Sequence, residues 1–244
     1  MIEVEGLSKR FGSRQAVDGL SLSARTGEIY GFLGPNGAGK TTTIRMLLGI
    51  LAPDTGSIRI CGRTVRRGDR AGRMLVGAVS ELQYLYADMT CEEYLSFFAS
   101  LHRVVRAKER VAEMLSDVGL AERAGDRAVE LSKGLQQKLG LARALLHDPP
   151  VLILDEPVSG LDPHGIREVR EIITRERGRG RLVFISSHVL SEIERTADRV
   201  GIIRQGRLVY EGPVGDVVTR HGTLEEAFVA MTSEAVATSP ETVT

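Results

Sequence analysis

The residues with the clearest chemical potential form a glycine-rich loop near the N-terminus. Residues 34–41 read GPNGAGKT, between an apolar stretch at 28–33 and a helix-periodic segment at 42–51. A loop of this kind between a strand and a helix binds phosphate, because its backbone N–H groups and the positive end of the helix surround the anion. Lys40 is expected to contact the terminal phosphates, and Thr41 to coordinate magnesium. A plain glycine-rich turn is the alternative, but it explains neither Lys40 nor Thr41.

A second chemical feature is a pair of adjacent carboxylates at the end of an apolar run. Residues 151–154 (VLIL) form the run, and Asp155 and Glu156 follow it. Open α/β sheets bind ligands at the carboxyl ends of their strands, so both side chains are expected beside the bound phosphates. Asp155 would hold magnesium, and Glu156 would polarise the water that attacks the γ-phosphate. The pattern therefore predicts nucleotide hydrolysis.

Hydrophobic periodicity indicates the elements that must position these residues. Helix-periodic segments separate short apolar runs at 28–33, 75–79, 151–154 and 182–185. This alternation predicts an α/β protein. The first 35 residues instead contain partly alternating runs around a turn at 11–13, so a small antiparallel sheet is expected there. Thr90 and Glu93 have capping-box spacing, and helices are expected from there to about His147.

Composition excludes several classes of function. The chain has 244 residues, and its 32 basic residues balance its 32 acidic ones, so no net field favours nucleic acid or an anionic membrane surface. Apolar runs stay far below the roughly 18 residues that cross a bilayer, and the N-terminus lacks the regions of a signal peptide. Cys61 and Cys91 form no metal-binding pattern. A cytoplasmic protein is therefore expected.

Three further motifs accompany the phosphate loop. LSKGLQQ at residues 131–137 precedes the paired carboxylates, SGLD at 159–162 follows them, and His188 comes after the apolar run at 182–185. In this order the motifs resemble those of the ATP-binding cassette (ABC) family: a signature, a D-loop and a switch histidine. Phe11 stands where the family has an aromatic residue that stacks on adenine. The resemblance extends over roughly residues 2–231.

The resemblance implies a fold and a division of the chain. The expected fold is a P-loop, RecA-like ABC ATPase core with an antiparallel β subdomain and an α-helical subdomain near residues 86–147. Residues 1–231 would form a single nucleotide-binding domain. Residues 232–244, rich in Ser, Thr and Ala, would form a disordered tail.

The resemblance also implies a site for ATP and Mg²⁺. Glu156 and His188 would be catalytic, and Thr41, Asp155 and Glu81 would hold the metal. The nucleotide would be bound by Phe11, Gly34, Asn36, Gly37, Gly39, Lys40, Thr41, Thr42, Ser132 and Gly134. The last two would contact the ATP of a partner domain, because the family pairs two such domains head to tail around the nucleotides.

The expected function is the ATP-hydrolysing subunit of a membrane ABC transporter, docked on integral membrane subunits at the cytoplasmic face of the cell membrane. The segment 212–228 is similar to the short ending of exporter subunits, which favours export. One alternative is a soluble ABC-type ATPase that acts on nucleic acid or ribosomes, although such proteins usually carry two cassettes or a long coiled-coil insertion. Another is a P-loop kinase or GTPase. Direct nucleic-acid binding is not expected.

Three positions depart from the family pattern. Glu81 stands where the Q-loop usually has glutamine, with Gln83 two residues later. A carboxylate there can ligate magnesium, but it adds negative charge near the phosphates. Lys133 and Leu135 replace the first glycine and the final glutamine of the signature, and the lost hydrogen bond is worth about 0.5–1.5 kcal/mol.

Two clusters follow from composition alone. Five aromatic residues fall between positions 84 and 98, of which Tyr84 and Tyr86 are the better candidates for a surface that meets the membrane partner. Five arginines fall between positions 63 and 73. We interpret these arginines as a solvated loop face and assign them no function.

Overall fold

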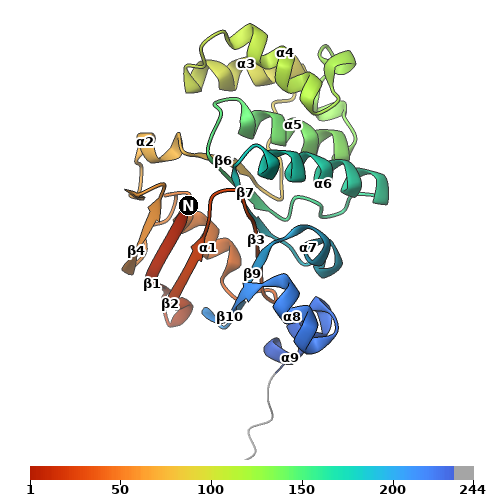
Figure 1. The fold of residues 1–244 in the computed structure, drawn as a ribbon. Helices are drawn as coiled ribbons and strands as arrows, with labels where there is room; N and C mark the ends of the chain where they lie inside the picture. Colours follow the sequence, from red (N-terminus) through yellow and green to blue (C-terminus); the bar gives the residue numbers. More distant parts are fainter. Residues whose placement is uncertain (234–244) are drawn as a thin grey trace, which may run out of the picture.

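The computed structural model describes residues 1–233 and contains two sheets, of which the larger is flanked by helices and the smaller lies at the edge of the molecule (Figure 1). The larger sheet has six strands in the order β10-β9-β3-β8-β7-β6. They are β3 (Ile29–Leu33), β6 (Val76–Val79), β7 (Val151–Asp155), β8 (Leu182–Ser186), β9 (Arg199–Arg204) and β10 (Arg207–Pro213). β9, β3, β8, β7 and β6 run parallel, and β10 pairs antiparallel with β9. All four apolar runs predicted as strands belong to this sheet.

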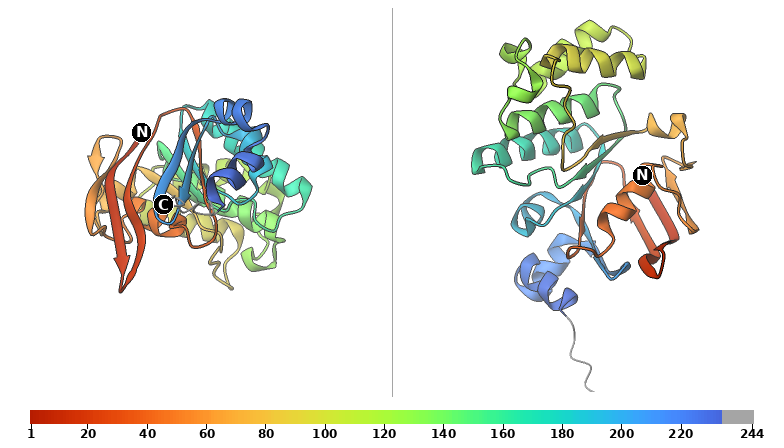
Figure 2. Two further views of the ribbon diagram at one scale, coloured as in Figure 1. Left: turned by 90° about the horizontal axis from the view of Figure 1, so that it is seen from below. Right: turned by 180° about the vertical axis from the view of Figure 1, so that it is seen from behind.

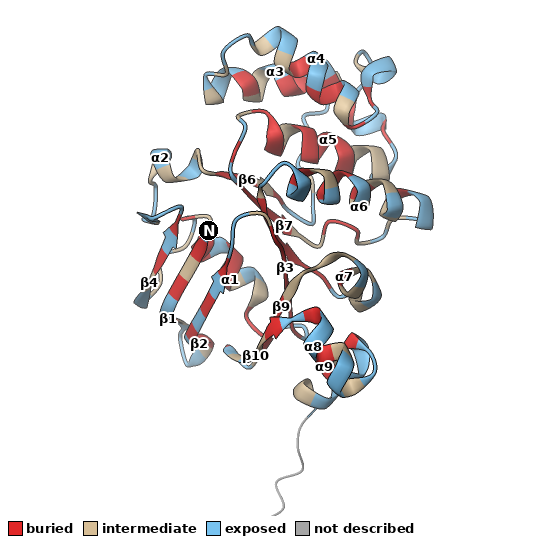
Figure 3. Ribbon diagram, in the orientation of Figure 1, coloured by how far each residue is buried: buried red, intermediate tan, exposed pale blue. Residues whose placement is uncertain are grey.

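The two faces of the large sheet contribute to two hydrophobic cores. Tyr30, Phe32 and Phe184 pack toward α1 (Lys40–Leu47) and the smaller sheet, and the rings of Tyr30 and Phe184 stack 5.3 Å apart. The alternate residues, such as Ile185, pack toward the other helices. Every residue of β3 and β8 is buried, and the centre of the large sheet is red in Figure 3, the colour of buried residues. Because both faces are covered, polar chemistry is confined to the strand ends.

The smaller sheet confirms the antiparallel arrangement predicted near the N-terminus and extends it. β1 (Ile2–Phe11) and β2 (Arg14–Ala24) form a hairpin. β4 (Thr55–Ile60) and β5 (Arg63–Thr64) continue the sheet beyond β1, in the order β2-β1-β4-β5 (Figure 2). The prediction placed this sheet within the first 35 residues and was therefore too short.

A layer of helices lies against one end of the large sheet. It comprises α3 (Cys91–His102), α4 (Ala107–Asp117) and α5 (Lys133–Leu145), with 3-10 turns at Ala121–Arg123 and Ala128–Glu130. The predicted capping box begins α3, because Thr90 Oγ1 accepts a hydrogen bond from Glu93 N–H at 3.2 Å, and Thr90 N–H donates to the Glu93 carboxylate at 2.9 Å. Arg143 ties the layer to the sheet through hydrogen bonds to the Tyr94 hydroxyl (3.1 Å) and the Ala78 carbonyl (3.0 Å).

Five further helices complete the described chain. They are α2 (Arg70–Arg73), α6 (Pro163–Gly178), α7 (Leu190–Thr196), α8 (Val214–His221) and α9 (Leu224–Thr232). No helix within residues 1–233 is long and apolar enough to cross a membrane. The predicted domain boundary at residue 231 stays a prediction, and the predicted tail falls on residues 234–244, outside the described residues, apart from its first two positions.

Two histidines stack where the helical layer meets the sheet. The rings of His102, at the end of α3, and His147, after α5, lie 4.1 Å apart and nearly parallel. Among the described residues, neither ring nitrogen of His147 has a hydrogen-bond partner. Burial, assisted by the neighbouring His102, lowers the pKa of His147 to about 4. His147 is therefore neutral at physiological pH.

We expect His147→Leu to make the free energy of unfolding decrease less steeply as the pH is lowered. The pKa of this histidine is 6.5 in its ordinary state and about 4 in the fold, so the unfolded chain binds more protons between those values. The favourable contribution is complete above pH 6.5 and is lost as the pH falls through 4, by about 3 kcal/mol at most. Urea unfolding of both proteins at several pH values measures the difference. Equal pH slopes would contradict a neutral, buried His147.

Candidate active site

The glycine-rich loop joins β3 to α1 and fits closely against β2. Gly39 precedes α1 with a φ of 114°, and a Cβ atom there would collide with the carbonyl oxygen of Ala16. Position 39 therefore requires glycine. Lys40 Nζ donates hydrogen bonds to the carbonyl oxygens of Gly34, at 2.5 Å, and Pro35, at 3.3 Å. The ammonium group thus lies against the loop that is predicted to hold the phosphates.

Two carboxylates at the end of β7 interact electrostatically with the ammonium group of Lys40. Burial lowers the pKa of Lys40, whereas the negative charges of Glu156 and Asp155 act in the opposite direction. The fold has therefore brought the phosphate loop and the paired carboxylates to one place. Hydrogen bonds between a charged donor and a phosphate are strong in such a partly dry site.

A cavity of about 420 Å³ opens beside the loop. Its lining comprises Phe11, Arg14, Ala16, Asn36, Gly37, Gly39, Lys40, Thr41, Thr42, Glu81, Asp155 and Glu156. The structure thus brings together most of the residues that the sequence predicted for nucleotide and metal. Phe11 remains 50% exposed, which leaves its ring free to stack on a base. Arg14 and Ala16 were not predicted from the sequence.

Asp155 and Glu156 are held at the end of β7 by the neighbouring strand β8. Ser186 Oγ donates a hydrogen bond to Asp155 Oδ1 at 2.5 Å, and Glu156 N–H donates to the Ser186 carbonyl at 3.1 Å. Glu156 has a φ of 51°, in the left-handed region that costs a non-glycine residue of order 1 kcal/mol. Such strain persists where surrounding contacts fix the backbone, and it is concentrated at functional sites.

His188 contacts the predicted catalytic carboxylate directly. Its Nδ1 atom lies 2.7 Å from Glu156 Oε2, and its backbone N–H donates to the same oxygen at 3.2 Å. Because a carboxylate only accepts hydrogen bonds, Nδ1 carries the proton and Nε2 remains available to another group. The His188 side chain is 61% exposed, so Nε2 is open to a ligand. The catalytic roles of both residues stay predictions.

The two candidates for the Q-loop position have different surroundings. Glu81 lines the cavity with the phosphate loop, whereas Gln83 packs against Gly140. The Gln83 amide donates to the Ser80 carbonyl at 2.8 Å, and its oxygen is buried without a partner among residues 1–233. The carboxylate, not the amide, therefore faces the predicted metal.

The donor set around the cavity fits magnesium. Thr41, Asp155 and Glu81 offer one hydroxyl and two carboxylates on the same lining, and hard oxygen ligands are those that Mg²⁺ prefers. No sulfur or imidazole group belongs to that lining. The predicted metal residues thus line one cavity with the phosphate loop, and their joint binding of one ion stays a prediction.

The signature residues lie elsewhere. Ser132 caps the N-terminus of α5, where its hydroxyl accepts a long hydrogen bond of 3.5 Å from Leu135 N–H. Leu135 packs against the large core, and the Lys133 ammonium lies beside Gly160 of the D-loop segment. In the described chain, neither Ser132 nor Gly134 lines the cavity of the phosphate loop. One copy of the chain therefore holds these two parts of the predicted site apart.

A second, larger cavity of about 560 Å³ lies between the helical layer and the core. Apolar side chains from α1, β6, α3 and the segments that follow α1 and β5 line it, including Leu47, Ile50, Val65, Val76 and Phe98. Tyr84 and Tyr86 are 80% and 49% exposed, as predicted for surface residues, but neither lines this groove. Their contact with a membrane partner stays a prediction.

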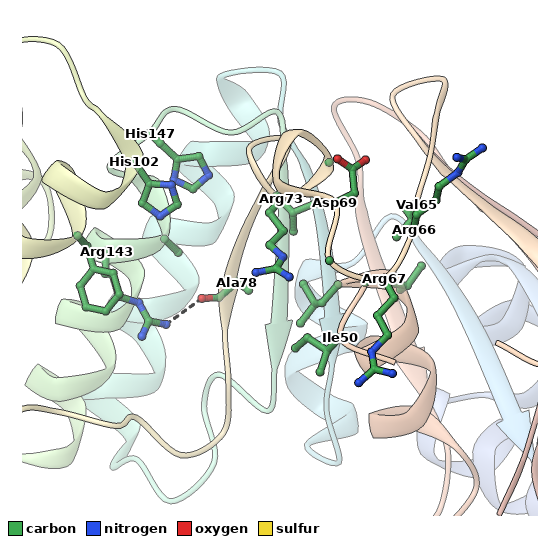
Figure 4. A pocket seen from close by; sticks show the side chains of 18 residues that line it. Ile50, Val65, Arg66, Arg67, Asp69, Arg73, Ala78, His102, Arg143 and His147 are labelled. Carbon is green, nitrogen blue, oxygen red and sulfur yellow. Dashed lines mark hydrogen bonds between the residues drawn. The ribbon is translucent and has the colours of Figure 1, made fainter. Parts of the chain in front are cut away.

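The arginine cluster gives this groove a positive rim. Arg66, Arg67 and Arg73 line it, so the interpretation of the cluster as a solvated loop face is incomplete. Figure 4 shows Arg67 and Arg73 pointing toward the groove and Arg66 pointing outward. Neither Arg67 nor Arg73 forms an ion pair with a described carboxylate, whereas Asp69, on the same lining, is paired with Arg63. Arg67 and Arg73 therefore point toward an apolar groove without a paired carboxylate among the described residues.

Comparisons with known proteins agree with this geometry. Residues 17–159 match the ABC transporter family. The bacitracin transport ATP-binding protein BcrA of Bacillus licheniformis is 43% identical over 222 residues, 91% of this chain and 72% of that protein. A Nod factor export ATP-binding protein I of Paraburkholderia xenovorans (strain LB400) is 43% identical over 213 residues, 86% of this chain and 70% of that protein.

The structural comparison covers nearly the whole chain. A solved structure of the ATP-binding subunit of an ABC transporter has 30% identity and a TM-score of 0.87, over 96% of this chain and 100% of that one. This match confirms the predicted P-loop ABC fold.

The phosphate loop and the carboxylates at the edge of a parallel sheet define a P-loop ATPase. The chain belongs to the ABC transporter family, in which it is an ATP-binding subunit whose ATP hydrolysis is coupled to transport. Such subunits work in pairs and with membrane subunits. Membership of this family excludes the alternative of a P-loop kinase or GTPase.

We expect Glu156→Gln to retain ATP binding but to lower the hydrolysis rate by about 100-fold or more, as removal of a general base commonly does. The amide keeps the shape of the side chain but cannot accept a proton from water. ATP affinity by calorimetry and phosphate release on the same preparation separate binding from chemistry. Glu171→Gln, on the exposed face of α6, is the matched control and should leave both unchanged. Near-normal turnover of Glu156→Gln would remove this carboxylate from the role of base.

Proposed function

We propose that this subunit powers an exporter by pairing head to tail with a second nucleotide-binding domain around bound ATP. The observation that carries the pairing is the separation of Ser132 and Gly134 from the cavity of the phosphate loop. In a head-to-tail pair, the N-terminus of α5 in one chain would face the γ-phosphate bound by the other, where a helix N-terminus stabilises negative charge. Export is supported by the names of relatives, which include a Nod factor export ATP-binding protein.

Hydrolysis in this proposal uses the residues at the sheet edge. Lys40 and the loop amides bind the phosphates, and Phe11 stacks on the base. Glu156 orients and deprotonates water, while His188, fixed by its hydrogen bond to Glu156, presents Nε2 toward the γ-phosphate. Thr41, Asp155 and Glu81 would hold Mg²⁺, which supplies charge neutralisation for the phosphates. After hydrolysis the γ-phosphate no longer bridges the two chains, and the pair opens.

The membrane partner in this proposal docks at the arginine-rimmed groove. An apolar floor with Ile50 and Phe98 suits one face of an amphipathic helix, as in other helix-in-groove interfaces. Because Arg67 and Arg73 have no carboxylate partner among the described residues, we assign acidic side chains to the flanks of that helix. The occupant is an acidic cytoplasmic helix of an integral membrane subunit. The chain then sits at the cytoplasmic face of the cell membrane.

The rival function is a soluble ABC-type ATPase on nucleic acid or ribosomes. An arginine rim also attracts phosphates, so the rim alone does not separate the two. The apolar floor does favour a protein helix, because a nucleic-acid backbone has no apolar face that would bury Ile50, which is 58% exposed.

We expect a tagged copy, purified from detergent-solubilised membranes of its native host, to recover a multi-helix membrane protein. Arg67→Glu with Arg73→Glu should lower that recovery by about tenfold, since like charges then face each other in a buried interface. Arg25→Glu with Arg59→Glu is the matched control, because both arginines are exposed outside the groove and form no ion pair in the described chain. ATP affinity should not change in either variant.

The outcomes separate two failures. Recovery with ribosomes or DNA, and not with a membrane protein, would overturn the transporter assignment. Recovery of the membrane protein that is insensitive to the groove variant would overturn only the acidic helix at this groove.

A further inference from the structure

Arg14 occupies a position in the ATP cavity that the family resemblance did not assign. It is the first residue of β2 and pairs with Phe11 across the hairpin. Its Nη2 atom donates a hydrogen bond to the Gly37 carbonyl at 3.0 Å, so the guanidinium lies on the phosphate loop. Arg10, on the opposite strand of the same hairpin, instead donates to the Gln15 amide oxygen at 2.9 Å and does not line the cavity.

The contact of Arg14 parallels that of Lys40. Both cations are held by backbone carbonyls of the phosphate loop, Lys40 by Gly34 and Pro35, and Arg14 by Gly37. Arg14 forms no ion pair with any carboxylate in residues 1–233, and the structure gives its side chain a single hydrogen bond. A guanidinium has five N–H donors in a planar fork that matches a phosphate. Most of its hydrogen-bonding capacity is therefore available to a ligand in the cavity.

The balance of charge on the cavity lining suits a cation at position 14. The lining carries three carboxylates, Glu81, Asp155 and Glu156, and two cations, Lys40 and Arg14. Glu81 is the additional acid, because the family usually has a neutral glutamine at that position. Without Arg14, Lys40 would be the single cation on this lining while an anionic nucleotide enters the same cavity.

We propose that Arg14 is a second phosphate-binding cation of the ATP site and that it offsets the negative charge of Glu81. When the nucleotide enters, the N–H groups of the guanidinium that do not bind the Gly37 carbonyl donate hydrogen bonds to phosphate oxygens. The helix α1 and Lys40 bind the phosphates from one side of the loop, and Arg14 binds them from the β2 side. This role concerns ATP binding in one chain and does not depend on the transport direction or on the membrane partner.

Titration calorimetry with ATP in EDTA isolates the charge effect, because without a divalent ion Glu81 cannot act as a metal ligand and only repels the phosphates. Arg14→Ala should weaken ATP binding by about tenfold, the size expected for loss of a charged hydrogen bond. Arg14→Lys should weaken it less, and Arg10→Ala, the matched control on the same hairpin, should change it by less than about twofold. Thermal unfolding of each variant establishes that the hairpin is intact.

The second arm tests the pairing of Arg14 with Glu81. In EDTA, the Arg14→Ala, Glu81→Gln double variant should bind ATP about threefold or more tighter than the Arg14→Ala variant, because a neutral amide then replaces the uncompensated carboxylate. An Arg14→Ala affinity within about twofold of the unsubstituted protein would overturn the phosphate-binding role. A tenfold loss that Glu81→Gln does not restore would overturn the charge offset.

Discussion

The site depends on the parallel alignment of four adjacent strands, β3, β8, β7 and β6. Because these strands run in one direction, their carboxyl ends meet at a single edge of the sheet, and the register sets Asp155 beside Ser186. The phosphate loop follows β3, the carboxylates end β7, and His188 follows β8. Their strands are buried and apolar, so the polar groups have no other place to gather. The position of the predicted catalytic groups thus follows from the packing of the apolar strands.

The features predicted correctly from the sequence are those that depend on local residue patterns. The four apolar runs, the phosphate loop and the capping box of α3 depend on neighbouring residues only, and the structure contains all of them. β4 and β5 were missed because their place beside β1 depends on pairing between segments far apart in the chain. Arg14 was missed for a related reason. A hairpin with its turn at 12–13 sets positions 11 and 14 opposite each other, and that register was the available signal.

The groove shows a different limit of sequence reasoning. Its arginines fall in a loop and a short helix with no periodic pattern, so the sequence gives no sign that they border a cavity. The apolar floor comes from α1, β6, α3 and the segments after α1 and β5, which meet only in the folded chain. The function of a charge cluster therefore depends on its neighbours in the fold, and Arg67 and Arg73 lie beside exposed apolar surface.

The ATP site and the groove are joined by contiguous contacts through α5. The turn after Glu156 begins with Ser159 N–H donating to the Glu156 carbonyl at 3.1 Å, and Gly160, the next residue, lies against the Lys133 ammonium at the start of α5. At the other end of this 13-residue helix, Arg143 holds the Ala78 carbonyl and lines the groove.

Leu135 adds an apolar anchor to the first turn of α5, where the family usually has glutamine. α5 therefore carries residues of the signature segment at its start and a residue of the groove lining at its end. Lys133 and Leu135, which replace a glycine and a glutamine of the family pattern, thus both make contacts within their own chain, Lys133 with the D-loop segment and Leu135 with the large core.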